Sequence, residues 1–271
     1  MGNIRYTFAI PVHNGEKYIS ETIDSILCQS EEKIVLFVLD NGSTDKTTEI
    51  VKSYDDPRIK LINYDFVDSL SESLNRCFEI QYSSSLFSIV HADDFISKNF
   101  AEEAIKLARK NLNYGIFFTS AFIVDKNSII KKSFINLIKF IFNFLYSNYI
   151  GKKGIFRIIC FNTLIAPAAI YRTNEIDNYH KFEKGSVFLT DLYFWINYLN
   201  KGGKIKVYYK KLFFLRSHNI QESNKFYNFH LRHKEYSDLE KYFRKEISNN
   251  MFLKLSFRIN YLLNKIFLKF K

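Results

Sequence analysis

Two short polar turns in the first half of the chain carry side chains that can bind a nucleotide or a metal ion. The first, DNGSTD, begins with Asp40 directly after the apolar run IVLFVL. The second, HADD, contributes His91, Asp93 and Asp94. A carboxylate such as Asp40 can accept hydrogen bonds from a base N–H or a ribose hydroxyl. Two adjacent acids can hold a hard divalent cation through their oxygens, and that cation can bridge the phosphates of a substrate. Each acid also has a structural alternative, because Asp40 can form an Asx turn and Asp94 can cap the following helix.

These two turns can act together only if a sheet brings them to one edge. The sequence of residues 1–125 has a pattern that is typical of such a sheet. Apolar, β-rich runs alternate with segments whose apolar residues recur at helical spacing. Such alternation predicts an α/β protein with a mostly parallel sheet covered by helices on both faces. Ligands in such sheets lie beyond the carboxyl ends of the strands, where the polar clusters 13–14, 40–45 and 91–94 fall. The predicted strands are 6–12, 34–39, 58–63, 86–90 and 116–124, and the predicted helices are 18–29, 43 or 44 to about 53, 69–81 and 99–111.

The second half of the chain is less regular. Residues 133–161 are aromatic and basic and predict one or two amphipathic helices. A small-residue, apolar run covers 163–171, and a helix is predicted over 190–199, ending at Gly202 and Gly203. The patterns that follow predict two strands in 204–215 that flank a turn at Lys210 and Lys211, and then a charged helix in 225–250.

Charge divides the chain unequally. Residues 1–125 carry 12 Lys and Arg against 19 Asp and Glu, whereas residues 126–271 carry 27 against 9, within a formal net charge of +11. A basic second half predicts an anionic partner, which is a nucleic acid, a phosphorylated substrate or a membrane surface. The three cysteines form no CxxC pair, so a disulfide framework is not supported and a reducing cytosol is expected. The sequence predicts neither a signal peptide nor a membrane-spanning helix.

Four segments in a fixed order resemble family 2 glycosyltransferases of the GT-A fold. They are AIPVHNGEKYISETIDSILCQS, FVLDNGSTDKTTEIV, DPRIKLI and IVHADDFIS, and they lie between Ala9 and Ser97. Looser matches follow in NTLIAPAAIYR, FLTDLYFWINYLNKGGKI and LFFLRSHNIQES. The resemblance covers most of residues 4–223 and implies a GT-A domain over 1–223. This domain has a nucleotide-sugar half of about 1–125 and an acceptor half of about 126–223, followed by a basic helical extension over 224–271.

The resemblance implies an inverting transfer of a sugar, a hexose or an N-acetylhexosamine, from a nucleotide-sugar, usually a UDP-sugar, to a hydroxyl. On the matching positions, Pro11, Val12 and Asn14 are expected to line the nucleoside pocket, with Glu16 nearby. Asp40 is expected to contact the base.

The same resemblance implies which residues bind the metal ion and the phosphates. Asp93 is expected to bind a divalent cation, Mn²⁺ or Mg²⁺, with Asp94 as a further candidate ligand. His91 stands where many members have the first acid of a D-x-D pattern. His218 is expected to complete the metal shell or bind the pyrophosphate, and Arg216 to neutralise phosphate charge.

Asp191 matches the catalytic-base position of the family, before an apolar helix that carries a tryptophan. An attacking hydroxyl must lose its proton, so a positioned carboxylate is needed to accept it. Thr190 replaces an acid that many relatives carry. The alternative is that Asp191 caps its helix, with Thr190 as a rival cap, and Trp195 is expected to pack a helix face.

Residues 251–271 predict a helix with a basic edge beside an apolar arc. At 100° per residue, Lys254, Arg258, Lys265 and Lys269 fall within about 60° of one another. This pattern is typical of a helix that lies at a membrane surface. The alternative is a helix that packs on the globular core and exposes its lysines.

Together these features predict a metal-dependent glycosyltransferase that acts on a glycan or lipid-linked acceptor. Lys, Asn, Ile and Phe are abundant, which suggests an AT-rich bacterial genome and a surface polysaccharide, lipooligosaccharide or capsule as the product. The expected location is the cytoplasm, with peripheral contact to the anionic inner face of the cytoplasmic membrane. A nucleotidyltransferase is the first alternative, although IPVHNGEKY is not a glycine-rich phosphate loop. A nucleic-acid-binding module is the second, but the acidic first half and the absence of zinc-finger, RRM or KH signatures argue against a nucleic-acid partner.

Overall fold

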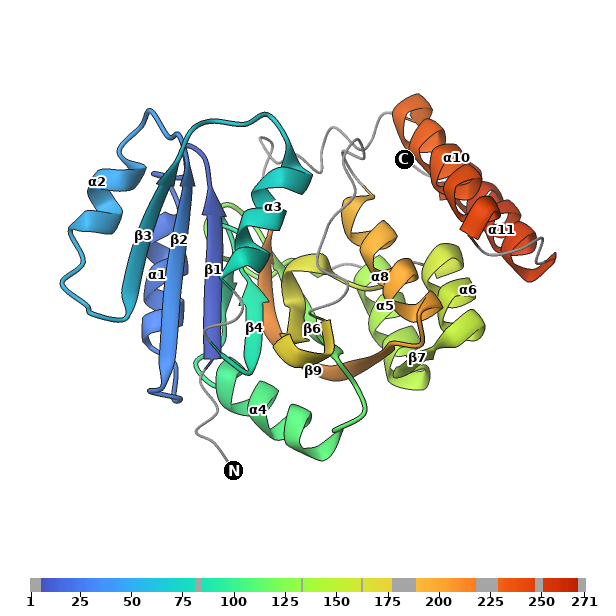
Figure 1. Cartoon of the computed structure of the whole chain (residues 1–271), viewed down its shortest axis with the longest axis horizontal. Coiled ribbons are helices and arrows are strands. Elements are labelled where there is room, and N and C mark those ends of the chain that lie inside the picture. The colour runs from blue at the N-terminus through green and yellow to red at the C-terminus, as the bar shows by residue number, and fades with distance from the viewer. Residues whose placement is uncertain are drawn as a thin grey trace.

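A single mixed sheet runs through the molecule, and helices cover both of its faces (Figure 1). The strand order in this computed structural model is β3-β2-β1-β4-β8-β6-β9-β5, with β7 paired to β9. The structure describes residues 6–80, 84–132, 134–161, 163–176, 189–217, 229–246 and 251–267. The predicted α/β class with helices on both faces of the sheet is confirmed.

The first half of the sheet is parallel. It contains β1 (Tyr6–Val12), β2 (Ile34–Asn41), β3 (Ile59–Tyr64) and β4 (Leu86–Ile89), joined by α1 (Ile19–Leu27), α2 (Thr47–Lys52) and α3 (Leu70–Glu79). These strands and helices confirm the sequence predictions to within a few residues at each end. The register pairs Val12 with Asp40, so the carboxyl ends of β1 and β2 lie side by side.

The predicted start of α2 is wrong, because the helix begins at Thr47 and neither Ser43 nor Thr44 caps it. The side chain of Asp45 instead accepts a hydrogen bond from the Thr47 backbone N–H at 2.9 Å. Ser43 and Thr44 bond to Asn14 of the neighbouring loop, so tertiary contacts use the residues that a local pattern assigns to the cap.

The second half of the sheet is mixed. It contains β5 (Phe95–Ile96), β6 (Ile116–Val124), β7 (Asn148–Ile150), β8 (Ala169–Arg172) and β9 (Lys204–Arg216), with α4 (Phe100–Lys110) between β5 and β6. Strand β8 is antiparallel to β4 and β6, whereas β9 is parallel to β6. A 3₁₀ turn at Ala166–Ala168 leads into β8.

Strand β9 differs from the prediction of two strands around a turn. It is one strand of 13 residues, and its register with β6 shifts where Thr119 pairs with Tyr208 and Ser120 pairs with Lys211. The lysines that suggested a turn therefore lie in a β-bulge, which adds residues to one strand without reversing the chain.

Two hydrophobic clusters lie on opposite faces of the sheet, as the strand alternation requires. Phe8 and Ile10 of β1 pack against α1 and α4 on one face, whereas Ala9 belongs to the cluster on the other face. The second cluster includes α3 and the helices of the second half. Trp195 is fully buried there and meets the Phe118 ring edge-on at 4.9 Å, so its predicted packing role is confirmed.

The remaining helices gather at one end of the sheet (Figure 1). They are α5 (Phe134–Leu145), α6 (Gly151–Phe161), α7 (Thr173–Ile176), α8 (Thr190–Asn200), α10 (Phe229–Glu246) and α11 (Met251–Phe267). Segment 133–161 thus forms two helices, one of the two predicted outcomes. Leu239 and Phe243 of α10 are fully buried, and Phe257 of α11 is buried where α11 packs on α6. Within the described residues, no helix is long and apolar enough to cross a membrane.

Candidate active site

The loop after β1 and the loop after β2 are tied into one surface at the carboxyl end of the sheet. The Asn14 side-chain oxygen accepts a hydrogen bond from the Thr44 backbone N–H at 2.8 Å, and the Asn14 N–H donates to the Ser43 hydroxyl at 2.8 Å. Asn14 has a positive φ of 53°, a conformation that asparagine tolerates better than most residues. Glu16 adds a further tie, because its carboxylate accepts from the Lys46 backbone N–H at 3.0 Å. Asn14 and Glu16 therefore shape this loop pair, whatever they contact in a ligand.

Asp40 shows features of both roles considered from the sequence, an Asx turn and a hydrogen-bond acceptor for a ligand. One oxygen, Oδ2, accepts from the Ser43 backbone N–H at 3.1 Å, which is the predicted Asx turn. The other oxygen, Oδ1, is buried and has no hydrogen-bond partner among the described residues. An acceptor held in this state at the carboxyl edge of β2 can receive a donor from a ligand. Val12 of the adjacent strand β1 pairs with Asp40 but is only 4% exposed, and Pro11 precedes it on the opposite face of the strand.

His91, Asp93 and Asp94 form a compact group directly after β4. Ligand atoms from the three side chains all lie within 4.8 Å of one another. Asp94 is only 1% exposed, and its Oδ2 has no hydrogen-bond partner among the described residues. Its Oδ1 accepts from the Arg216 backbone N–H at 2.8 Å. Since a buried carboxylate oxygen without a donor is costly, a cation in this position would satisfy the group.

The electrostatics of this group also fit a cation. Burial and the neighbouring charge of Asp93 raise the pKa of Asp94 well above the usual carboxyl range. Burial lowers the pKa of His91, although Asp93 acts in the opposite direction, so the imidazole is neutral near pH 7. A neutral imidazole is the form that binds a metal, and a bound cation would displace the proton from Asp94.

Helix α1 supports the turn that carries these residues. The Thr22 hydroxyl lies 2.9 Å from the carbonyl oxygen of Ala92 and 2.7 Å from that of Asp94. The buried helix side of α1 therefore fixes the backbone on both sides of Asp93.

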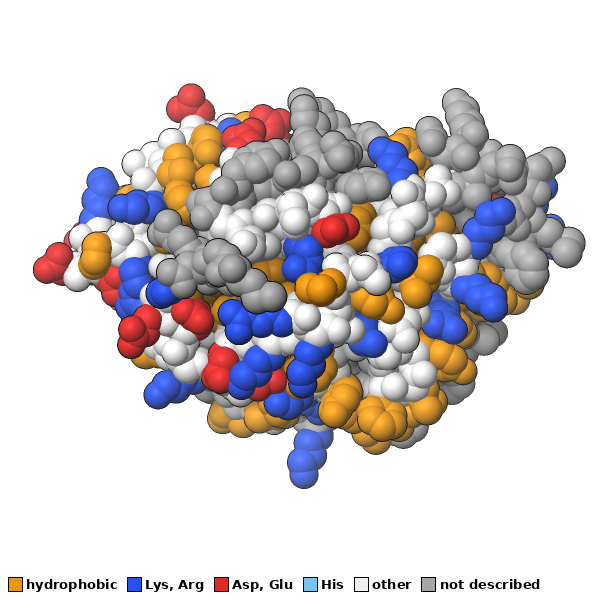
Figure 2. All heavy atoms as spheres, turned by 60° about the horizontal axis from the view of Figure 1, so that its bottom comes forward, with side chains coloured by type: hydrophobic (Ala, Val, Ile, Leu, Met, Phe, Trp, Pro, Cys, Tyr) orange, Lys and Arg blue, Asp and Glu red, His pale blue; other side chains and the backbone are white. Residues whose placement is uncertain are grey.

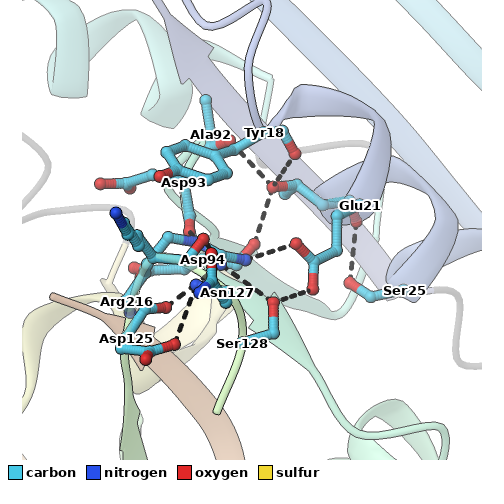
Figure 3. A network of polar contacts seen from close by, with 12 residues as sticks. Tyr18, Glu21, Ser25, Ala92, Asp93, Asp94, Asp125, Asn127, Ser128 and Arg216 are labelled. Carbon is cyan, nitrogen blue, oxygen red and sulfur yellow. Dashed lines mark hydrogen bonds and ion pairs between the residues drawn. The ribbon is translucent and has the colours of Figure 1, made fainter. Parts of the chain in front are cut away.

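Arg216 holds the same turn from the opposite direction (Figure 3). It is 1% exposed, and its Nε donates to the Asp93 carbonyl oxygen at 2.7 Å. Its Nη2 donates to Glu21 at 2.5 Å, and its Nη1 donates to the Ser128 hydroxyl at 2.9 Å. The guanidinium also lies over the Tyr18 ring, 4.4 Å from its centroid. These contacts differ from the phosphate contact expected from the sequence: Arg216 is directed into the protein and positions the backbone of Asp93.

Glu21 and Ser128 were not singled out by the sequence patterns. Glu21 occupies a polar position inside a predicted helix, and Ser128 lies in an ordinary polar turn, so no local signal marks either residue. In the structure, the Ser128 hydroxyl donates to Glu21 Oε1 at 2.6 Å, and both contact Arg216. Three segments that are far apart in the sequence thus meet behind the turn that carries Asp93 (Figure 3).

Asp191 lies in the first turn of α8, but it is not the capping residue. The residue before the helix is Leu189, and Asp191 Oδ1 accepts a hydrogen bond from the Leu192 backbone N–H at 2.9 Å. Burial raises the pKa of Asp191 to about 6, and the charge of Glu235 adds to this rise against the local hydrogen bonds. A carboxyl group with this pKa is ionised at pH 7 and is still basic enough to accept a proton.

Glu235 was also missed by the sequence analysis. It belongs to α10 in the C-terminal extension, and its Oε2 accepts from the Leu189 backbone N–H at 3.1 Å. The extension therefore supplies a hydrogen-bond acceptor to the amino-terminal end of α8, where backbone N–H groups lack partners within the helix. His218, predicted as a metal ligand, lies outside the described residues.

Comparison with known proteins identifies the family. The model of "Glycosyl transferase family 2" matches residues 7–170, which is more than half of the chain. An uncharacterized glycosyltransferase of Haemophilus influenzae is 30% identical over 220 residues, covering 78% of this chain and 65% of the relative. A protein of Escherichia coli named UDP-Glc:alpha-D-GlcNAc-diphosphoundecaprenol beta-1,3-glucosyltransferase WfgD is 28% identical over 180 residues, covering 66% and 69%. The chain thus spans just under two thirds of the Haemophilus relative's length.

Solved structures show the same fold at low sequence identity. TarS of Staphylococcus aureus, residues 1–349 in complex with UDP-GlcNAc, aligns with a TM-score of 0.65 at 20% identity, over 82% of this chain and 61% of that one. The mannosyltransferase PcManGT of Pyrobaculum calidifontis, in complex with GDP-Man and Mn²⁺, aligns with a TM-score of 0.67 at 16% identity, over 97% and 70%. With its sheet of GT-A type and a family match that includes the turns carrying Asp40 and Asp93, the chain belongs to glycosyl transferase family 2.

Proposed function

We propose that this protein transfers a sugar from a nucleotide-sugar, a UDP-sugar in the first instance, to a hydroxyl of a glycan or lipid-linked acceptor, with inversion at the anomeric carbon. The biological product proposed is a bacterial surface polysaccharide, lipooligosaccharide or capsule. The observation that carries the proposal is the group of His91, Asp93 and Asp94 at the carboxyl end of β4, with a buried carboxylate oxygen that lacks a donor. The donor class is supported by the UDP-sugar in the name of WfgD and by the UDP-GlcNAc in the TarS complex.

In this proposal a divalent cation is held by Asp93, Asp94 and His91. A bound cation would neutralise the charge that develops on the departing nucleoside diphosphate. A donor set of one imidazole and two carboxylates suits Mn²⁺ better than Mg²⁺, because Mg²⁺ prefers oxygen ligands throughout its shell. We expect Mn²⁺ to give the higher activity.

The chain's own residues divide the remaining work. Asp40 accepts a hydrogen bond from the base through its Oδ1, which has no partner among the described residues. The partly exposed Pro11 lies against the nucleoside, whereas Val12 is 4% exposed and supports the end of the strand from within the core. Asp191 takes the proton of the acceptor hydroxyl as that oxygen attacks the anomeric carbon. A single displacement of this kind inverts the anomeric configuration. Arg216 acts through the backbone of Asp93, without touching the substrate.

The lipid-linked acceptor is supported by the diphosphoundecaprenol in the name of WfgD. Such an acceptor is embedded in a membrane, so the enzyme would work at the inner face of the cytoplasmic membrane. The basic second half of the chain fits contact with an anionic surface.

A panel of nucleotide-sugars tests the proposal. Release of nucleoside diphosphate should be measured with each sugar in Mn²⁺, in Mg²⁺ and in a chelator. We expect release from at least one UDP-sugar that depends on the metal, and none from Asp93→Asn under the same conditions. Metal-independent release at equal rate, or cleavage to a nucleoside monophosphate, would overturn the proposed reaction.

A further inference from the structure

Helix α5 turns its apolar side toward solvent. Leu137, Ile141, Phe144 and Leu145 are each 48% to 64% exposed. At 100° per residue these four positions fall within an arc of about 100°, so they form one stripe along the helix. An apolar stripe of this width normally faces a protein core.

The opposite side of α5 carries the buried polar group. Asn143 is 6% exposed, and its side-chain nitrogen donates to the Thr163 carbonyl oxygen at 3.5 Å. Phe142 packs on Phe161 at the end of α6, with ring centroids 4.6 Å apart. The helix is therefore attached to the domain through this side, and this attachment leaves the apolar stripe facing solvent.

The bulge in β9 adds aromatic and basic groups beside the stripe. The Tyr209 ring is 49% exposed and meets the Phe144 ring edge-on at 5.6 Å. The Lys211 ammonium lies 5.0 Å from the centroid of the Phe140 ring, on the same helix. Lys210 and Lys211 are both exposed. Together, Leu137, Ile141, Phe144, Leu145, Tyr209, Lys210 and Lys211 are called the α5–β9 surface below.

The chain around the α5–β9 surface is rich in basic residues and poor in acidic ones. No Asp or Glu occurs between Asp125 and Glu175, nor in residues 192–220, which include all of β9. Among the described contacts, the acid that reaches this surface is Glu103 of α4, which accepts from Lys210 at 2.8 Å. Figure 2 shows most of the acidic side chains of one face toward the left, basic side chains on both sides, and a group of apolar side chains toward the lower right, the side of α5 and α6 in Figure 1.

We propose that the α5–β9 surface is the part of the protein that lies on an anionic phospholipid membrane. The apolar stripe enters the boundary between headgroups and acyl chains, and the Lys211 ammonium meets the headgroup phosphates. Lys210 is paired with Glu103 of α4. This inference deepens the proposed function, on which its biological purpose rests, by naming the surface that would bring a lipid-linked acceptor to the enzyme.

The C-terminal helix is the competing surface. Helix α11 packs on α6 through the side that carries Phe257 and Asn260, and Leu255, Arg258, Tyr261 and Leu262 are exposed. In its described residues, the α5–β9 surface presents five exposed apolar or aromatic groups against three on α11, and its Lys211 lies against a ring of α5. The α5–β9 surface and the candidate active site also share strand β9. Lys211 of the surface and Arg216 of the site are five residues apart on this strand, which is about 16 Å along an extended chain.

Vesicle flotation with the full chain tests the inference. Vesicles of phosphatidylcholine alone should be compared with vesicles that also contain phosphatidylglycerol. The unmodified protein should bind the anionic vesicles, and Ile141→Asp with Phe144→Asp should bind them at least tenfold more weakly. Lys211→Gln should weaken binding about fivefold and only on the anionic vesicles, the size expected for one basic residue near such a surface.

Leu255→Asp with Leu262→Asp on α11 is the matched control, because it makes the same change at exposed positions of the competing helix. This variant should bind like the unmodified protein. Thermal melting and UDP binding of both variants report that the fold is retained, and the vesicle assay needs no donor sugar, so it can succeed or fail independently of the proposed reaction.

Three results would overturn the inference. The first is that the unmodified chain does not bind anionic vesicles. The second is that the α11 variant alone loses binding. The third is that the α5 variant keeps vesicle binding but changes the molar mass measured by light scattering, which would assign the surface to contact between two copies of the chain.

Discussion

The two ends of the candidate site are held in different ways. Beside the parallel strands, Asp40 lies at the end of β2 and Asp93 lies in the turn after β4. The Ser43 backbone N–H bonds to the Asp40 side chain, and the Arg216 guanidinium bonds to the Asp93 carbonyl oxygen. In the helical half, Asp191 lies at the start of α8, and Glu235 from the much later helix α10 bonds to the end of that helix. The first arrangement depends on strand order, and the second depends on how distant helices pack.

This difference has a functional consequence. A carboxylate at the sheet edge can bind a ligand by its position alone, whereas a general base needs an environment that raises its pKa. Burial among helices supplies that environment to Asp191, and α10 contributes part of the charge. Arg216, the last residue of β9, supports the turn after β4.

The largest expected effect on the transfer rate is at Asp191, the proposed catalytic base. Asp191→Asn keeps the size of the side chain and removes its basicity, so transfer should fall by about 10² to 10⁴. UDP and Mn²⁺ affinities should be unchanged, because the group acts on the acceptor proton. Transfer rates and calorimetric binding of UDP check this prediction.

Stability separates this role from a structural one. Because burial raises the pKa of Asp191, the protonated form is favoured in the folded state, and that stabilisation is present at low pH and lost as pH rises through about 6. At pH 8, Asp191→Asn should therefore melt at the same temperature as the unmodified protein or higher. Asp238→Asn on the exposed side of α10 is the matched control, with no expected effect on rate. Near-normal transfer by Asp191→Asn would exclude the catalytic role.

The next effect is at the turn after β4. Asp93→Asn should abolish the metal-dependent part of UDP affinity and reduce transfer about 10²- to 10³-fold, the range for removing a group that stabilises developing charge. UDP titrations with and without Mn²⁺ measure it, with Asp55→Asn on an exposed turn as the control. Equal UDP affinity in Mn²⁺ and in chelator for the unmodified protein would contradict it.

A smaller effect tests whether the support of that turn matters. Glu21→Gln removes the charge that holds the Arg216 guanidinium, so the Asp93 backbone should be less well fixed. Mn²⁺ affinity should fall about 10-fold, the lower end for residues that orient metal ligands, while metal-free UDP binding stays the same. Glu49→Gln, at an exposed position of α2, should change neither quantity. An unchanged Mn²⁺ affinity in Glu21→Gln would show that the turn needs no such support.

The smallest expected effect is a change in pH dependence. If Asp191 must be ionised, kcat should rise with pH up to about 6 and level off above it. Glu235→Gln keeps a hydrogen-bond acceptor near the Leu189 N–H and removes the charge, so the midpoint should move to lower pH. Tyr171 also faces Asp191 and stays neutral throughout this range, because burial raises its pKa far above neutrality. A midpoint that is unchanged or higher would contradict the proposed influence of α10.

Much of the first half could be predicted because its signals are local. Strand and helix periodicity placed β1 to β4 and α1 to α4 within a few residues, and the polar turns after β2 and β4 mark the sheet edge on which Asp40 and Asp93 lie. The exceptions are also informative. Ser43 and Thr44 look like helix caps, but they bond to Asn14, and Lys210 and Lys211 look like a turn, but they lie in a bulge.

The sequence by itself determined the α/β class, the order of the motifs, and the residue types that can bind a nucleotide and a metal. It did so because alternation, turn residues and acids at strand ends are properties of neighbouring positions in the chain. Only the tertiary structure decided that Arg216 points into the protein toward Glu21, that Glu235 lies at the start of α8, and that α5 exposes its apolar stripe. These properties depend on which elements pack against one another, and the same local pattern is compatible with several packings. The burial and charge that raise the pKa of Asp191 arise at that level, so the pKa that suits Asp191 to the proposed role of base is a property of the fold.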